Sequence, residues 1–334
     1  MNLGVIGLIV NPAAGAGAER NLDLACAALD SLEWNTVLAG PDLFGGHAAP
    51  EAQLIPSPGL RGRAASQWLA RQMTAAGADL LVVVGGDGTM TDVAAALAAV
   101  DSHVPILGIG AGSTNAGDLI TCRGDSIDLL RDAQFAVQTL DALVASCNGE
   151  ELGLAFNDVV IGVTVVGTLG GRVCDLDAVA FHAGERRVGR PQPVGAARAL
   201  VKKQFRDRLV TIAQGEEIGT VIAGFAHHEC FYGKAIVGGV CLTDLVGLPA
   251  GCLVSTQPLV RTQMAQDELA AVEPIRSAYV SLGEDEQIEV TGLGSPAMLC
   301  ADGNPLAALA FDDVVQIRVG RQAARVVRMV TEAP

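Results

Sequence analysis

The sequence is poor in aromatic and basic residues, and both shortages exclude classes of function. Aromatic residues make up 4% of its 334 residues, while half of the chain is hydrophobic. This composition is typical of helices packed on sheets. The 22 lysines and arginines are outnumbered by 37 aspartates and glutamates, which gives a formal charge of −15. Because negative charge repels nucleic acids and anionic membrane surfaces, we expect neither as a main partner.

Long apolar runs and paired cysteines are also missing. No run approaches the roughly 20 apolar residues that span a bilayer, and the opening MNLGVIGLIVNP has no basic region or cleavage site. We therefore expect a soluble, cytoplasmic protein. The eight cysteines lie singly, which favours buried free thiols over disulfides or a zinc site. His227-His228-Glu229-Cys230 would alternate between strand faces, so we expect no metal ion held by the protein alone.

Residues 1–138 alternate between apolar, strand-like segments and helix-like segments. Strands are predicted at residues 3–10, 36–39, 80–84 and 104–109, and helices at 18–32, 63–76 and 90–100. Fully apolar strands that alternate with helices are typical of a parallel sheet covered on both faces. A passage rich in glycine and proline, residues 40–62, predicts a long loop or a lid. The prediction is an α/β nucleotide-binding domain.

Residues 139–334 are richer in short β-type segments. These lie at 152–166, 210–213, 220–226, 235–242, 252–256, 287–291, 297–301 and 314–319, and glycine turns separate them. The spacing predicts a β-rich, mostly antiparallel, sandwich-like C-terminal domain. A helix is predicted within it, over residues 194–205.

Gly85-Gly86-Asp87-Gly88-Thr89 lies between a predicted strand and a predicted helix. Parallel sheets bind ligands beyond the carboxyl ends of their strands. There, glycine lets phosphate oxygens approach backbone N–H groups, the helix N-terminus favours anions, and Thr89 can cap the helix or contact a phosphate. Asp87 would repel a phosphate unless it binds a cation or accepts a proton from a nucleophile. The alternative is an ordinary turn with Asp87 as a helix cap.

This loop resembles the signature of the superfamily of NAD kinases, diacylglycerol and sphingosine kinases, and acetoin-catabolism protein X. Asn11-Pro12-Ala13-Ala14-Gly15 resembles its N-P-x-x-G element, Asn157-Asp158 the N-[ED] pair of NAD kinases, and Asp302-Gly303 its C-terminal D-G turn. The four elements occur in the right order. The resemblance implies an α/β N-terminal domain with a parallel sheet, a sandwich-like second domain and a nucleotide in the cleft between them.

Two departures bear on the branch within this superfamily. The G-S-T-A-Y segment of NAD kinases is missing from residues 160–320. Gly112-Ser113-Thr114-Asn115 resembles the G-T-x-N-D loop of lipid kinases, with Ala116 in place of their aspartate. The mixture, together with NDVVIGVTVVGT at residues 157–168, is most similar to the acetoin-catabolism branch.

The resemblance implies a phosphotransferase that moves a phosphoryl group from ATP or polyphosphate to a hydroxyl of NAD or a related metabolite, with Mg²⁺ accompanying the ATP. Since no Gly-x-x-x-x-Gly-Lys-[Ser/Thr] occurs, the glycine loops would hold the phosphates. Asp87 would accept the proton of the nucleophile, Asn157 and Asp158 would hold acceptor hydroxyls, and Asp302 is a further candidate. The phosphate-lining candidates are Asn11, Gly15, Gly85, Gly86, Gly88, Thr89, Gly112, Ser113, Thr114 and Asn115.

Alternative functions remain at this point. A nucleotide-binding sensor without transfer would explain the missing segment, while a lipid kinase fits poorly with the acidic charge. We expect a homo-oligomer, either a dimer or a tetramer. A basic segment comprises Arg186, Arg187, Arg190, Arg198, Lys202, Lys203, Arg206 and Arg208. It either clamps a polyphosphate or forms a solvated helix face or subunit contact.

Overall fold

The computed structural model describes residues 3–15, 17–112, 115, 117–170, 172–225, 243, 246–262, 266, 274–294 and 296–330. The chain forms two compact units, the first comprising Met1–Asp141 with Gln322–Pro334 and the second Ala142–Arg321. The sequence predicts a single division after residue 138. In the structure the chain crosses between units twice, within β7 (Gln134–Cys147) and within β20 (Val314–Val330).

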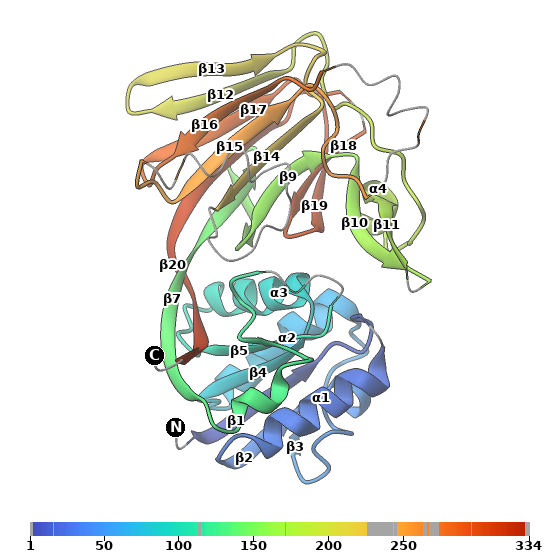
Figure 1. Ribbon diagram of the computed structural model, residues 1–334, viewed down its shortest axis with the longest axis vertical. Coiled ribbons are helices and arrows are strands. Elements are labelled where there is room, and N and C mark those ends of the chain that lie inside the picture. The colour runs from blue at the N-terminus through green and yellow to red at the C-terminus, as the bar shows by residue number, and fades with distance from the viewer. Residues whose placement is uncertain are drawn as a thin grey trace. The chain divides into compact units, whose positions relative to one another are not determined.

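The first unit contains a parallel sheet (Figure 1). Its strands are β1 (Leu3–Val10), β2 (Trp34–Ala39), β3 (Gln53–Leu54), β4 (Leu80–Gly85), β5 (Ile106–Gly110) and β6 (Cys122–Arg123). The order is β5-β4-β1-β2-β3, and the last part of β20 and the short β6 both pair with β5. Every residue of β4 is buried, as a strand with both faces covered requires.

Helices cover this sheet on two faces. Ile6, Leu8 and Val10 of β1 pack in one cluster with residues of α1 (Ala18–Asp30). Gly7 points to the other face, where a Cβ at this position would lie 3.0 Å from the sulfur of Met73 in α2 (Gly62–Ala75). The third helix, α3 (Asp87–Ala98), begins directly after β4. The predicted α/β domain with a parallel sheet is confirmed.

The predicted loop or lid at residues 40–62 is partly folded. It contains the 3-10 turn η1 (Asp42–Phe44) and the edge strand β3. The indole N–H of Trp68 in α2 donates to the carbonyl of Pro56. A second 3-10 turn, η2 (Ile127–Leu130), precedes β7.

The second unit is built from antiparallel strands. They are β8 (Glu150–Ala155), β9 (Asp158–Gly162), β10 (Thr164–Leu169), β11 (Arg172–Asp177), β12 (Leu200–Phe205), β13 (Arg208–Gln214), β14 (Thr220–Phe225), β15 (Ala250–Ser255), β16 (Ser277–Leu282), β17 (Glu286–Thr291), β18 (Ala297–Ala301) and β19 (Asn304–Leu309). One sheet has the order β16-β15-β14-β9-β18-β19, and a second runs β13-β12-β17-β20 (Figure 1). Apolar side chains of both sheets share one core. The predicted β-rich second domain is confirmed.

The helix predicted over residues 194–205 is wrong. Residues 200–205 form β12, which pairs with both β13 and β17. Val201 and Lys203 are buried while Lys202 is partly exposed, which is the two-residue alternation of a strand. The solvated helix face is therefore wrong as well. The prediction at 152–166 is divided among β8, β9 and β10. The one at 235–242 lies outside the described residues.

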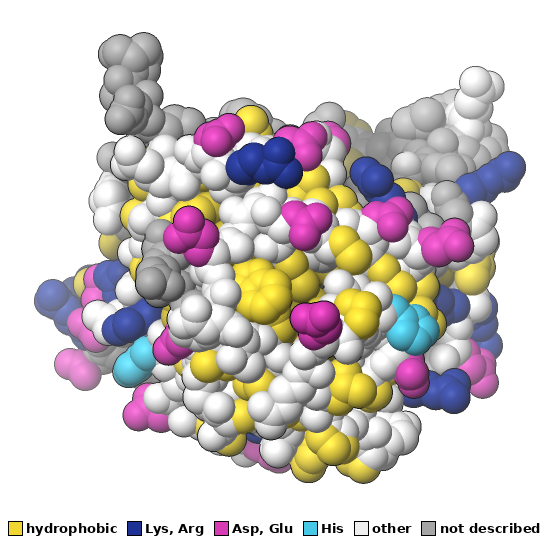
Figure 2. All heavy atoms as spheres, turned by 90° about the horizontal axis from the view of Figure 1, so that it is seen from below, with side chains coloured by type: hydrophobic (Ala, Val, Ile, Leu, Met, Phe, Trp, Pro, Cys, Tyr) yellow, Lys and Arg dark blue, Asp and Glu magenta, His cyan; other side chains and the backbone are white. Residues whose placement is uncertain are grey.

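The surface agrees with the acidic composition. On the face in Figure 2, acidic side chains are scattered among apolar ones, and most lysines and arginines lie towards its margins. Among the described helices, none is long and apolar enough to cross a membrane.

Candidate functional site

Three loops leave the carboxyl ends of β1, β4 and β5 side by side. In the register of the sheet, Val10 pairs with Val84, and Val84 pairs with Ile109. The three strands therefore end at the same level. Backbone hydrogen bonds continue past these ends, from Asn11 N–H to the Val84 carbonyl (2.9 Å) and from Ala111 N–H to the Gly85 carbonyl (2.7 Å).

The glycines of these loops are required by backbone contacts between the loops. Gly15 has φ 50°, and a Cβ there would lie 1.7 Å from the carbonyl oxygen of Ala111. A Cβ on Gly112 would lie 2.8 Å from the Cα of Gly86. Real side chains do not approach this closely, so only glycine permits this packing. The loops after β1, β4 and β5 are thus packed backbone against backbone.

Asn11 connects the loop after β1 to helix α3. Its Nδ2 donates to Thr89 Oγ1 at 2.8 Å, and its Oδ1 accepts from Ala13 N–H at 3.0 Å. Both polar atoms of the side chain are therefore occupied by the protein. Because the buried Thr89 hydroxyl accepts this bond, its own hydrogen is oriented away from Asn11. The side chain of Asn11 acts as a brace.

Asp87 connects α3 to the loop after β5. Its Oδ1 accepts from Gly117 N–H at 2.9 Å. The N-cap residue of α3 is Gly86, so Asp87 stands at the first helical position, one residue inside the cap. The alternative of Asp87 as the cap is therefore wrong.

Asn115 closes its own loop. Its Oδ1 accepts from Gly112 N–H at 2.7 Å, its Nδ2 donates to the Gly112 carbonyl at 2.8 Å, and its φ is 52°. Asparagine tolerates this left-handed conformation better than most residues. Ser113 and Thr114, which the sequence predicts to line the phosphates, lie outside the described residues.

Asn21 is a residue of this site that the sequence motifs do not reveal. It is fully buried in the first turns of α1, and its Nδ2 donates to the carbonyls of Asn11 and Ala14 at 2.9 Å each. It thereby ties the loop after β1 to helix α1. The sequence does contain one indication of this role. Asn21 lies three and four residues before Leu24 and Ala25, on the buried face of the helix, where a polar side chain needs a specific hydrogen-bond partner.

In the second unit, Asn157, Asp158 and Asp302 lie together. The backbone N–H groups of Asn157 and Asp158 both donate to the carboxylate of Asp302. The side-chain Oδ1 of Asn157 is buried and has no hydrogen-bond partner among the described residues. A buried acceptor of this kind usually has a donor, from the protein, water or a ligand.

Comparison with known proteins connects these features to a family. Residues 6–117 match the family model of the ATP-NAD kinase N-terminal domain. An uncharacterised protein of Archaeoglobus fulgidus is 30% identical over 246 residues, which cover 71% of this chain and 72% of the relative. The chain belongs to the family of this archaeal protein, and its N-terminal domain is NAD kinase-like.

Other relatives match a shorter part of the chain. The NAD kinase of Pseudomonas fluorescens is 35% identical over 118 residues, and the match spans only 36% of that protein. Two solved structures share the fold over nearly the whole chain. A putative diacylglycerol kinase from Bacillus anthracis has a TM-score of 0.54 at 15% identity and covers 98% of this chain and 97% of its own. Yeast NADH kinase, complexed with NADH, has a TM-score of 0.52 at 14% identity and covers 99% of this chain and 84% of its own.

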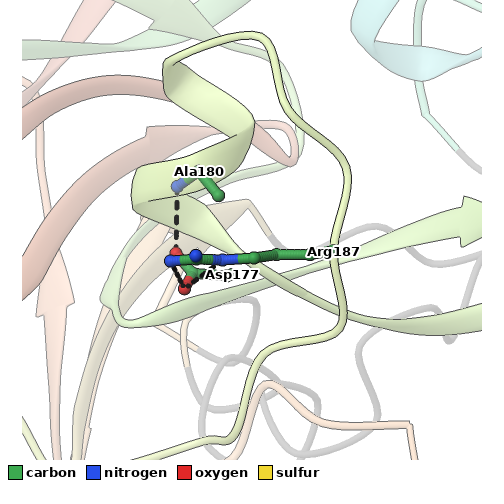
Figure 3. A network of polar contacts seen from close by, with 3 residues as sticks. All are labelled: Asp177, Ala180 and Arg187. Carbon is green, nitrogen blue, oxygen red and sulfur yellow. Dashed lines mark hydrogen bonds and ion pairs between the residues drawn. The ribbon is translucent and has the colours of Figure 1, made fainter.

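Outside the NAD kinase-like domain, part of the basic segment has structural roles. Arg187 Nε and Nη2 lie 3.1 and 2.7 Å from Asp177 Oδ2, while Asp177 Oδ1 accepts from Ala180 N–H at the start of α4 (Ala178–His182) (Figure 3). The Ala180 bond, followed by Arg187, lowers the pKa of Asp177. Lys203 is buried beside Glu286. Arg187 and Lys203 of the basic segment are therefore paired with carboxylates.

The thiols in the described residues are free. Burial raises the pKa of Cys122 to about 11 and that of Cys252 to about 12, so both stay protonated at neutral pH. Within the described ranges, no group of three or more histidine, cysteine or acidic residues is placed to hold a metal ion. His227-His228-Glu229-Cys230 lie outside those ranges.

Proposed function

We propose that this protein is a phosphotransferase that moves a phosphoryl group from ATP or polyphosphate to a hydroxyl of NAD or a related small metabolite. The observation that carries the proposal is the set of three packed loops at the carboxyl ends of β1, β4 and β5, which lies within the ATP-NAD kinase N-terminal domain. Ligands of parallel α/β sheets bind at such strand ends.

The loops suit a polyphosphate chain. They bring three stretches of backbone together at the strand ends, and α3 begins at Asp87 with the positive end of its dipole towards this edge. The Thr89 hydroxyl, oriented by Asn11, would donate to a phosphate oxygen. Of the candidates for lining the phosphates, Asn11 and Asn115 would act through loop geometry, since their side chains already bind the protein.

Asp87 would accept the proton of the acceptor hydroxyl as that oxygen attacks the terminal phosphorus. The bond from this phosphorus to the bridging oxygen would break, and ADP or the shortened polyphosphate would leave. Asp87 is the one carboxylate in the sequences 11–15, 85–89 and 111–115, and its bond to Gly117 N–H fixes its orientation. A single carboxylate, Asp87, fits a Mg²⁺ ion that arrives on ATP, because such an ion usually takes only one or two protein carboxylates besides the phosphates. The ion would neutralise charge on the transferring phosphoryl group.

Asn157 and Asp158 would hold the acceptor. The buried Oδ1 of Asn157, which has no partner in the described part of the chain, needs a donor such as a ribose hydroxyl, and Asp158 adds a second acceptor next to it. We further propose the acetoin-catabolism branch, on the resemblance of residues 157–168, and a cytoplasmic homo-oligomer.

Replacing the proposed base tests the phosphotransferase. Asp87→Asn should lower turnover of ATP with NAD by more than about a hundredfold, because the amide cannot accept the proton. ATP binding should persist, since the amide oxygen still accepts from Gly117 N–H. Steady-state kinetics and calorimetry give the two values, with the exposed-loop variant Asp101→Asn as control. Unchanged turnover in Asp87→Asn would contradict the proposal.

A second variant tests the acceptor site. Asp158→Ala should weaken binding of NAD and ATP by about 1.5–3 kcal/mol, the size of a hydrogen bond to a charged group. Inorganic polyphosphate should bind as before, because it has no ribose. Calorimetric titration of the three ligands measures this. Equal losses for all three, or none for any, would show that the Asn157-Asp158 pair is purely structural.

A nucleotide-binding sensor without transfer is the second candidate, favoured by the missing G-S-T-A-Y segment. It predicts that the wild-type protein binds ATP or NAD but shows no turnover with any diol or nucleotide acceptor. In that case Asp87→Asn would change neither property.

A further inference from the structure

The carboxylate of Asp302 binds three consecutive backbone N–H groups. Its Oδ2 accepts from Phe156 at 2.8 Å, and its Oδ1 accepts from Asn157 at 2.8 Å and from Asp158 at 3.0 Å. Its own N–H donates to the Asp158 carbonyl at 2.9 Å. Three carboxylate bonds and one backbone bond thus join Asp302 to a segment more than 140 residues away in sequence. Bonds from N–H groups to an ionised carboxylate are about twice as strong as neutral ones.

The turn that carries Asp302 has a separate requirement. Asp302 and Gly303 form the two-residue connection between Ala301 of β18 and Asn304 of β19, with φ of 46° and 76°. Aspartate or asparagine followed by glycine is the preferred sequence of such hairpin turns. The turn therefore accepts either residue, whereas the three N–H groups require a carboxylate.

These bonds act where one strand stops and the next begins. β8 ends at Ala155 and β9 starts at Asp158, so Asn157 lies between two strands. Consecutive residues within one strand point to opposite faces. Asn157 and Asp158 escape this rule because the backbone bends between the strands, and the bend is held by Asp302.

We propose that Asp302 is a positioning residue for the acceptor site. Its ionised carboxylate holds the bend at residues 156–158 so that the side chains of Asn157 and Asp158 both reach the acceptor, which Asp302 itself does not touch. The inference rests on the proposed role of Asn157 and Asp158 and adds the residue that sets their geometry.

Asp302→Asn tests this without changing the turn. The amide suits the left-handed φ, but its NH₂ group must face at least one backbone N–H that now meets the carboxylate. In the full chain, hydrogen exchange of the amides of residues 156–158 should accelerate about tenfold or more, and NAD affinity should fall by about tenfold or more. Inorganic tripolyphosphate should bind within about twofold of the wild-type value, because no ribose is involved.

The matched control is Asp313→Asn in the same unit. Asp313 also holds a turn, accepting from Ala310 N–H and from Asn148 Nδ2 at 2.7 Å each, and its substitution should leave NAD affinity unchanged. A second variant, Asp302→Gly, keeps the turn, since glycine adopts positive φ freely. Added formate should occupy the vacated N–H groups and restore slow exchange and NAD binding.

The outcomes separate this inference from the proposed function. Unchanged exchange in Asp302→Asn overturns the inference, and so does faster exchange with undiminished NAD binding. Equal losses of NAD and tripolyphosphate binding also overturn it, because they would indicate a general effect on the fold. If the wild-type protein binds no NAD, the proposed acceptor is wrong, and the exchange and formate rescue alone decide whether Asp302 holds the bend.

Discussion

Gly15→Ala should abolish nucleotide binding, with a loss of affinity of about a hundredfold or more, and should destabilise the first unit by about 1–3 kcal/mol, the usual cost of overpacking. The added methyl group would lie 1.7 Å from the Ala111 carbonyl oxygen, so the loops after β1 and β5 must separate. That separation would disturb the N–H groups offered to the phosphates. Calorimetry with ATP and thermal unfolding measure the two effects.

Gly77→Ala is the control for this variant. Gly77 also has a positive φ, 88°, but a Cβ there would meet no atom within 4 Å. Both variants carry the same kind of backbone strain, about 1–2 kcal/mol. The difference between them therefore isolates the contact with Ala111. If both bind ATP equally well, the packing of the loops does not matter for the nucleotide.

Lys203→Met should destabilise the protein by about 3–5 kcal/mol, the cost of leaving one partner of a buried ion pair without the other. The side chains of Lys203 and Glu286 are only 10% and 9% exposed, and their charged atoms lie 2.7 Å apart. Lys203 also donates to the Ser281 carbonyl, and Glu286 accepts from Gly283 N–H. Lys203 of β12 is thereby bonded both to β16, through Ser281, and to the first residue of β17, Glu286.

Denaturant unfolding of three variants separates pairing from packing. Adding Glu286→Gln to Lys203→Met should recover part of the lost free energy of unfolding, because no charge is then left buried. Arg318→Met breaks the half-exposed pair with Glu151 and should cost less than about 1 kcal/mol. A loss in Lys203→Met no larger than that in Arg318→Met would show that burial adds nothing to this pair.

The sequence predicted the fold correctly for strands that are buried on both faces, because such strands are apolar throughout. The apolar runs at β1, β4 and β5 are typical of strands in a parallel sheet that is covered on both faces, and the structure has that sheet. The helix over residues 194–205 was a wrong prediction. Arg198, Lys202 and Arg206 lie four residues apart, a spacing that places side chains on one face of a helix and equally on one face of a strand. The partner that makes Lys203 a buried strand residue, Glu286, lies 83 residues further along the chain, and local spacing carries no information about it.

The loop motifs of the candidate site could be predicted from the sequence, but the contacts that hold the loops in place could not. Glycine clusters after apolar runs indicate a ligand loop, and that reasoning located the sequences 11–15 and 85–89. The contact of Gly15 with Ala111 and the support of Asn11 by buried Asn21 depend on tertiary structure. The role of Asp302 was equally hidden, since a D-G pair signals only a turn until its carboxylate is seen to face three N–H groups.

The return of β20 to the first unit affects how the protein is made. Val326 pairs with Ile106 of β5, and the Val327 carbonyl accepts from the Thr121 hydroxyl. The second unit, Ala142–Arg321, comes between these partners and must be synthesised first. At about 5–20 residues per second, its 180 residues take roughly 10–40 seconds on the ribosome. For that time the nascent first unit has an open sheet edge at Ile106, where strand mispairing and chaperone binding compete with completion of the fold.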